Sequence, residues 1–109
     1  MQINEIKQRF GQFEHSVEDA VQLCQQDTHA SQQLADAVRD LDREVHQAHD
    51  LVCGAQQESA EITSCIDRLE DMGDDVKRAC QSASDLDRKT QDAMMSVHRQ
   101  ISDLKHQMH

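Results

Sequence analysis

Residues 34–52, LADAVRDLDREVHQAHDLV, place an apolar side chain alternately three and four residues apart. The apolar positions with this spacing are Leu34, Val38, Leu41, Val45, Ala48 and Val52. They form a seven-residue repeat with apolar a and d positions, and the same phase runs from Ile3 to Met108. A sustained period of 3.5 residues keeps one stripe of a helix facing its neighbours. The sequence therefore predicts an all-α protein of long heptad-repeat helices.

A second apolar position, g, widens this stripe. Most of the apolar residues outside a and d fall there, namely Leu23, Ala30, Ala37, Leu51, Cys65, Met72, Ala79, Leu86 and Ala93. A two-stranded coiled coil needs only the narrow a/d seam, whereas a helix that contacts two neighbours needs the wider a/d/g face. The pattern therefore favours a four-helix bundle.

The length of the chain predicts a single helical domain spanning 1–109. The best candidate for a turn lies near 52–56, where Gly54 can take the left-handed conformation that ends a helix. A second candidate is Met72–Asp75, and Ser16 could begin a helix. We expect an antiparallel two-helix hairpin that assembles into a four-helix coiled-coil bundle. One continuous rod and three or four shorter helices are the alternatives.

A hairpin or a rod leaves part of its apolar face uncovered, so the sequence predicts a homo-oligomer, with a dimer favoured. The predicted oligomer core consists of Ile3, Ile6, Phe10, Phe13, Val17, Leu34, Val38, Leu41, Val45, Val52, Ile62, Ile66, Leu69, Val76, Met94, Val97, Ile101 and Leu104. Polar residues interrupt the seam at Asp27, Ser31, Ser59, Asp87 and Thr90. We interpret them as loosened layers that set the register or soften the packing. Asp27 and Asp87 are the most unusual, because a buried unpaired carboxylate is costly.

The composition narrows the range of partners. A net charge of −10 disfavours nucleic acid and anionic membranes, which would repel the chain. No apolar run is long enough to cross a bilayer, so we expect a cytoplasmic protein without direct membrane insertion. The four scattered cysteines are typical of reduced core residues rather than of a disulfide framework.

Catalytic and cofactor-binding patterns are lacking in the sequence. No glycine-rich phosphate loop and no Cys-x-x-Cys pair occurs, so the sequence predicts neither an enzyme nor a cofactor. His46 with His49, and His106 with His109, have the i, i+3 spacing that places two imidazoles on one helical face. No second pair lies opposite the first in the pattern, and the terminal pair lies where a helix frays. We therefore expect no dedicated metal site and keep these four histidines as candidates.

Two stretches resemble a known family. Residues 57–72, QESAEITSCIDRLEDM, and residues 23–31, LCQQDTHAS, are similar to the long helices of methyl-accepting chemotaxis protein signalling domains. The resemblance implies a cytoplasmic antiparallel hairpin that dimerises into a four-helix bundle and transmits a signal by changing its packing. It also implies adaptation sites at glutamine or glutamate pairs flanked by small residues. The nearest matches are Gln32 with Gln33 and Gln56 with Gln57.

These observations define three functional hypotheses. The first is a non-catalytic coiled-coil interaction or signalling module that resembles the chemotaxis-receptor bundle. It would act through oligomerisation and through helix packing with a protein partner, such as another helical bundle. The second is a purely structural coiled-coil scaffold or spacer. The third is a His/Cys metal-binding bundle.

Overall fold

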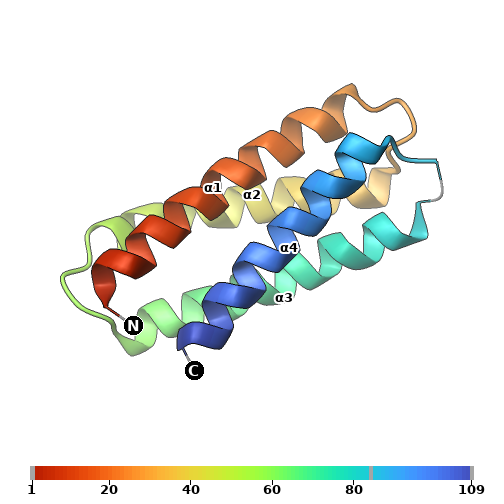
Figure 1. Ribbon diagram of the computed structural model, residues 1–109. Helices are drawn as coiled ribbons and strands as arrows, with labels where there is room; N and C mark the ends of the chain where they lie inside the picture. The colour runs from red at the N-terminus through yellow and green to blue at the C-terminus, as the bar shows by residue number, and fades with distance from the viewer. Residues whose placement is uncertain (1, 84, 109) are drawn as a thin grey trace.

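The structure, a computed structural model, describes residues 2–83 and 85–108. Within this part of the chain it contains four α-helices and no strand. They are α1 (Ile3–Gln26), α2 (Gln32–Cys53), α3 (Ala60–Ser82) and α4 (Arg88–Met108). Consecutive helices run in opposite directions, as Figure 1 shows. The predicted all-α class and four-helix bundle are therefore confirmed.

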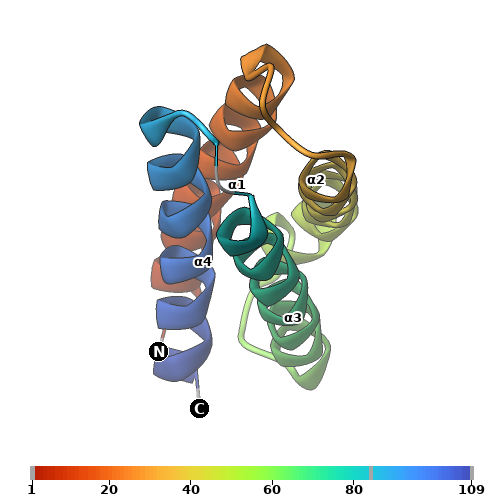
Figure 2. The ribbon, with the colours of Figure 1, turned by 90° about the vertical axis from the view of Figure 1, so that its right-hand side faces the viewer.

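The helices surround one core, and each packs against two others. Contacts join α1 with α2, α2 with α3, α3 with α4 and α4 with α1. Figure 2 shows this arrangement, and both ends of the chain lie at the end of the bundle that carries the α2–α3 loop (Figure 1). The molecule measures 43 × 22 × 18 Å. A continuous helical rod of this length would extend about 160 Å at 1.5 Å per residue, so the rod alternative is excluded.

The predicted core residues are buried within the single chain. All of them lie in the hydrophobic core of the bundle except Ile3, which is half-buried against it. The two-helix hairpin is thus wrong in detail, because each half of the chain folds back once more and supplies two helices. Since the four helices cover one another's apolar faces, the width of those faces no longer requires a second chain.

Four of the five polar residues of the seam lie at helix ends, which corrects their interpretation as softened layers, whereas Thr90 is buried in the first turn of α4. Ser31 and Ser59 are the N-caps of α2 and α3, and their hydroxyl oxygens accept hydrogen bonds from the backbone N–H groups of Leu34 and Ile62. Such bonds satisfy donors that the first turn of a helix leaves unpaired. Asp27 is the C-cap of α1.

Asp27 also joins two connections at one end of the bundle. Its side chain is only 1% exposed, and its carboxylate accepts hydrogen bonds from the backbone N–H groups of His29 at 2.9 Å and Asp87 at 3.0 Å. The His29 bond, followed by those from Asp87 and the Thr90 side chain, lowers the pKa of Asp27 despite its burial. Asp27 and Asp87 therefore lie close together, and the backbone N–H of Asp87 donates to the Asp27 carboxylate.

The candidate turns have mixed outcomes. Helix α2 ends at Cys53, so a turn near 52–56 is confirmed, although Gly54 has φ −86° and is right-handed. Met72–Asp75 is not a turn but lies inside α3. There Gly73 allows close helix packing, because a Cβ at this position would lie 2.9 Å from Cγ2 of Ile101. Ser16 begins no helix, since it lies within α1.

None of the described helices is long and apolar enough to cross a membrane.

Candidate interaction groove and polar cluster

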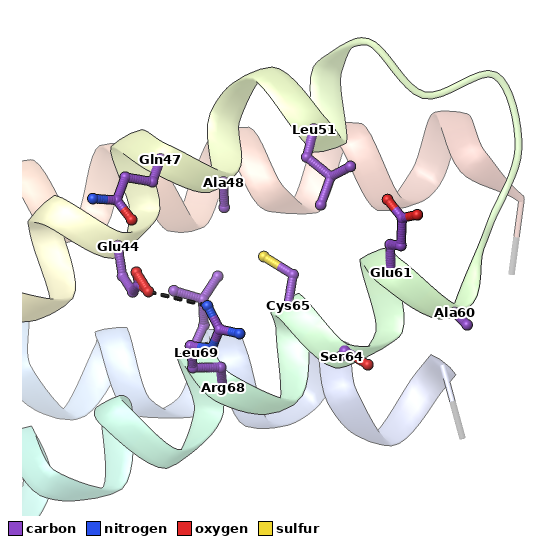
Figure 3. Close-up of a pocket in the computed structure, with 10 residues that line it drawn as sticks. All are labelled: Glu44, Gln47, Ala48, Leu51, Ala60, Glu61, Ser64, Cys65, Arg68 and Leu69. Atoms are coloured by element: carbon purple, nitrogen blue, oxygen red, sulfur yellow. Dashed lines mark hydrogen bonds and ion pairs between the residues drawn. The ribbon is translucent and has the colours of Figure 1, made fainter.

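A groove of about 530 Å³ lies between α2 and α3. The g positions of these antiparallel helices face each other across it, and the groove is lined by Glu44, Gln47, Ala48, Leu51, Ala60, Glu61, Ser64, Cys65, Arg68 and Leu69. Figure 3 shows the sulfur of Cys65 projecting into the space that Leu51 approaches from α2. Because the side chains of Ala48, Ala60 and Ser64 are small, they leave room between the two helices.

Leu51 makes this groove unusual. Of the residues that the structure describes, it is the one large apolar side chain classed as exposed, at 38%. The other g-position residues of α2 and α3 are Ala37, Glu44, Cys65, Met72 and Ala79, and the apolar ones among them are half-buried or buried. The large exposed apolar side chain of the a/d/g face therefore lies near the α2–α3 loop, whereas a smaller hollow of about 250 Å³, lined in part by Ala37, Met72 and Ala79, lies farther along the same interface.

Two glutamates and one arginine form the charged rim of the groove. Arg68 donates a hydrogen bond to Glu44 at 3.2 Å, and Glu61 lies at the other end beside Leu51 (Figure 3). Burial raises the pKa of the Cys65 thiol, an effect that Arg68 opposes and Glu44 reinforces. The thiol is thus protonated near neutral pH and packs as a small apolar side chain.

A second feature, the polar cluster, lies between α3 and α4 and consists of Glu70, Asp74 and His98. One potential ligand atom from each of these residues lies within 4.8 Å of those of the other two. His98 Nε2 is 2.7 Å from Asp74 Oδ1, and Lys105 Nζ donates to Glu70 Oε2 at 3.4 Å. The bond to Glu70 raises the pKa of Lys105.

The predicted metal candidates do not form such a cluster. His46 is exposed and binds the Asp42 carbonyl oxygen at 2.8 Å, which raises its pKa. His49 lies 3.0 Å from a carboxylate oxygen of Glu14 and 3.7 Å from the sulfur of Cys53. His106 is exposed near the end of α4. The fourth candidate, His109, lies outside the described residues.

The adaptation-like glutamine pairs occupy different environments. Gln32 and Gln33 are exposed in the first turn of α2, and Gln32 donates a hydrogen bond to Asp36. Gln56 and Gln57 are exposed in the α2–α3 loop. The two pairs therefore do not share one helical surface.

Sequence reasoning missed both the groove and the polar cluster, although signals for each exist. The apolar g positions that predict the bundle also line the groove. In the polar cluster, Glu70 and Asp74 have i, i+4 spacing, and Glu70 and His98 both occupy heptad position e. These signals become useful only once α3 and α4 are known to be separate antiparallel neighbours.

Comparison of the chain with protein-family models, curated proteins and solved structures gives no match.

Proposed function

We propose that this protein is a non-catalytic interaction module whose α2–α3 groove binds an amphipathic helix of a protein partner. The observation that carries the proposal is the apolar groove beside Leu51, which the chain's own helices leave uncovered. Open apolar surface is a common feature of binding sites. The family resemblance suggests the same general role, although it implies an extended hairpin rather than this compact bundle.

The shape of the groove favours a helical partner. Its lining residues span 44–51 of α2 and 60–69 of α3, which corresponds to about two turns of α2 and nearly three turns of α3. A helix that lies along such a groove inserts apolar side chains at i, i+3, i+4 and i+7. The small side chains of Ala48, Ala60 and Cys65 provide space for these insertions.

The charges favour basic residues on the flanks of that partner helix. Glu44, which pairs with Arg68, and Glu61 border the groove, and the whole chain has a net charge of −10. Lysine or arginine beside the apolar stripe would pair with this rim and accelerate association. A second copy of the chain carries the same negative charge and would be repelled. We therefore place a basic amphipathic helix, rather than a sister molecule, in the groove.

The compact shape supports binding over the alternative function of a structural spacer. A spacer acts by separating its ends, and this bundle is 43 Å long with both chain ends on one side. The geometry of the bundle therefore does not favour the spacer hypothesis.

Alkylation of the cysteines tests the proposal with an internal control. A designed helical peptide with a Leu/Ala stripe and lysine flanks should slow the alkylation of Cys65, which lines the groove, at least severalfold. The exposed Cys53 lies outside the groove lining and should react at an unchanged rate. Mass spectrometry of the alkylated chain resolves the two sites. The same peptide with glutamate flanks should protect Cys65 less well, because the rim would repel it.

Two matched variants locate the binding site. Leu51→Ser should weaken peptide binding at least about tenfold, which corresponds to the loss of one well-packed anchor residue. Leu23→Ser makes the same change at a half-buried residue of α1 and should leave the affinity nearly unchanged. If Leu51→Ser binds as tightly as wild type, or if saturating peptide leaves Cys65 reactive, the groove is not the binding site.

A further inference from the structure

We propose that Glu70, Asp74 and His98 form a site for a divalent transition-metal cation, with zinc as the test ion. This polar cluster is separate from the groove, because the α3–α4 interface holds it and none of its residues lines the groove. The two proposals can therefore fail independently.

The arrangement of the helices brings the three side chains together. Glu70 and Asp74 are one helical turn apart, so both project from one face of α3. His98 lies on α4, the antiparallel neighbour, and its Nε2 atom is 2.7 Å from Asp74 Oδ1. Residues on two packed helices are held more firmly than residues on a loop, so this geometry is largely formed before an ion arrives.

The spacing of the donor atoms fits one ion. Zinc binds nitrogen and carboxylate oxygen at about 2.0–2.2 Å, so neighbouring ligand atoms around it are roughly 3–4 Å apart. The three donor atoms here all lie within 4.8 Å of one another. Small side-chain rotations therefore suffice to bring them into a common coordination sphere.

The donor set selects the class of metal. An imidazole nitrogen suits zinc, iron, copper and nickel, whereas magnesium and calcium prefer oxygen ligands alone. Three protein ligands leave at least one position for water. The Asp74 side chain is 38% exposed, compared with 18% for His98 and 14% for Glu70, so an ion can enter from the Asp74 side.

Lys105 competes with the ion for Glu70. Its ammonium group lies 3.4 Å from Glu70 Oε2, and its side chain is 35% exposed. A bound divalent cation would repel this ammonium group, and the long side chain can move into solvent. Removal of the charge at position 105 should therefore strengthen metal binding.

Titration of the untagged full chain with zinc and with cobalt tests the proposal. We expect one zinc per chain by calorimetry and a cobalt d–d absorption without a sulfur-to-cobalt charge-transfer band, because the site contains no cysteine. His98→Gln and Asp74→Asn should each weaken zinc binding at least about tenfold. Lys105→Gln should strengthen it. Circular dichroism of each metal-free variant verifies that the bundle is intact.

Matched controls separate this site from other donors. His106→Gln and Asp71→Asn make the same chemical changes at exposed neighbouring positions and should leave zinc affinity unchanged. His49→Gln tests an alternative site in which His49, Glu14 and Cys53 would bind the ion. This variant should also leave zinc affinity unchanged. The proposal is overturned if zinc does not bind, if His98→Gln binds as tightly as wild type, or if His49→Gln abolishes binding. An unchanged or weaker affinity in Lys105→Gln would overturn the assignment of Glu70 as a ligand.

Discussion

Replacing Phe10 by alanine should lower the free energy of unfolding by about 3–5 kcal/mol, the usual cost of removing a buried aromatic ring. Phe10 is completely buried, and its ring packs against that of Phe13 with 6.4 Å between centroids. A domain of this size has about 5–15 kcal/mol of total stability. The variant should therefore lose a large part of it, as measured by urea unfolding followed with circular dichroism.

The adjacent residue provides a control for this substitution. Gly11 lies on the exposed side of α1, and a Cβ there would have no atom within 4 Å. Gly11→Ala should stabilise the protein by about 0.5–1 kcal/mol, because alanine restricts the unfolded chain and favours the helix. A loss below about 1 kcal/mol in Phe10→Ala would mean that the ring is not in a packed core. Destabilisation by Gly11→Ala would mean that this face of α1 is covered.

Replacing Asp27 by asparagine should give the largest effect among the polar residues, and the effect should depend on pH. The Asp27 carboxylate accepts hydrogen bonds from His29 and Asp87 and thereby joins the α1–α2 loop to the α3–α4 connection. Its pKa is lowered from the ordinary value of 3.8, first of all by the His29 bond. At pH 7 the ionised carboxylate stabilises the folded state, and the variant should melt several degrees below wild type.

The sign of the pH dependence follows from the lowered pKa. A carboxyl group that binds protons more weakly when folded contributes its full stability above its unfolded pKa and loses it as the pH falls through the folded pKa. The difference in melting temperature between wild type and Asp27→Asn should thus persist at pH values above 3.8 and shrink as the pH falls below 3.8. Asp85→Asn removes an exposed charge from the same connection and should show little difference from wild type at pH 7. A pH-independent difference for Asp27→Asn would show that ionisation of this side chain does not stabilise the fold.

The core could be predicted from the sequence because burial follows the heptad pattern residue by residue. The positions of the helix ends could not, because each loop includes one d and the following a position of the repeat. These pairs are Asp27 with Ser31, Ala55 with Ser59, and Ala83 with Asp87. The count of seven therefore resumes in phase after every loop, so an unbroken phase does not imply an unbroken helix.

Two serine N-caps were the local signal that could have located the first residues of α2 and α3. Ser31 and Ser59 each precede an apolar core residue by three positions, the spacing of an N-cap that binds the N3 backbone N–H. Their place in the seam made them resemble polar core layers instead. At Gly73 the sequence suggested a turn where the helix continues, because a glycine inside a polar stretch is typical of turns. In the structure this glycine lies within α3 and permits close packing against Ile101.

The candidate sites could be predicted only in part. The exposed apolar groove depends on which g positions face each other, and the polar cluster depends on which helix lies beside α3. Both follow from the number and order of the helices. Histidine spacing along one helix indicated His46 and His49, whereas the structure brings His98 to two carboxylates on another helix. Spacing within a helix cannot reveal ligands that different helices contribute.

Small-angle X-ray scattering across a range of concentrations tests the central claim, that one chain alone covers its apolar seam with four helices. We predict a particle of one chain mass, 12.4 kDa, with a radius of gyration slightly above the 13.7 Å of its Cα atoms. Both values should stay constant on dilution. A particle of twice that mass at the lowest concentration, or an elongated one approaching the length of a continuous rod, would contradict the single-chain bundle.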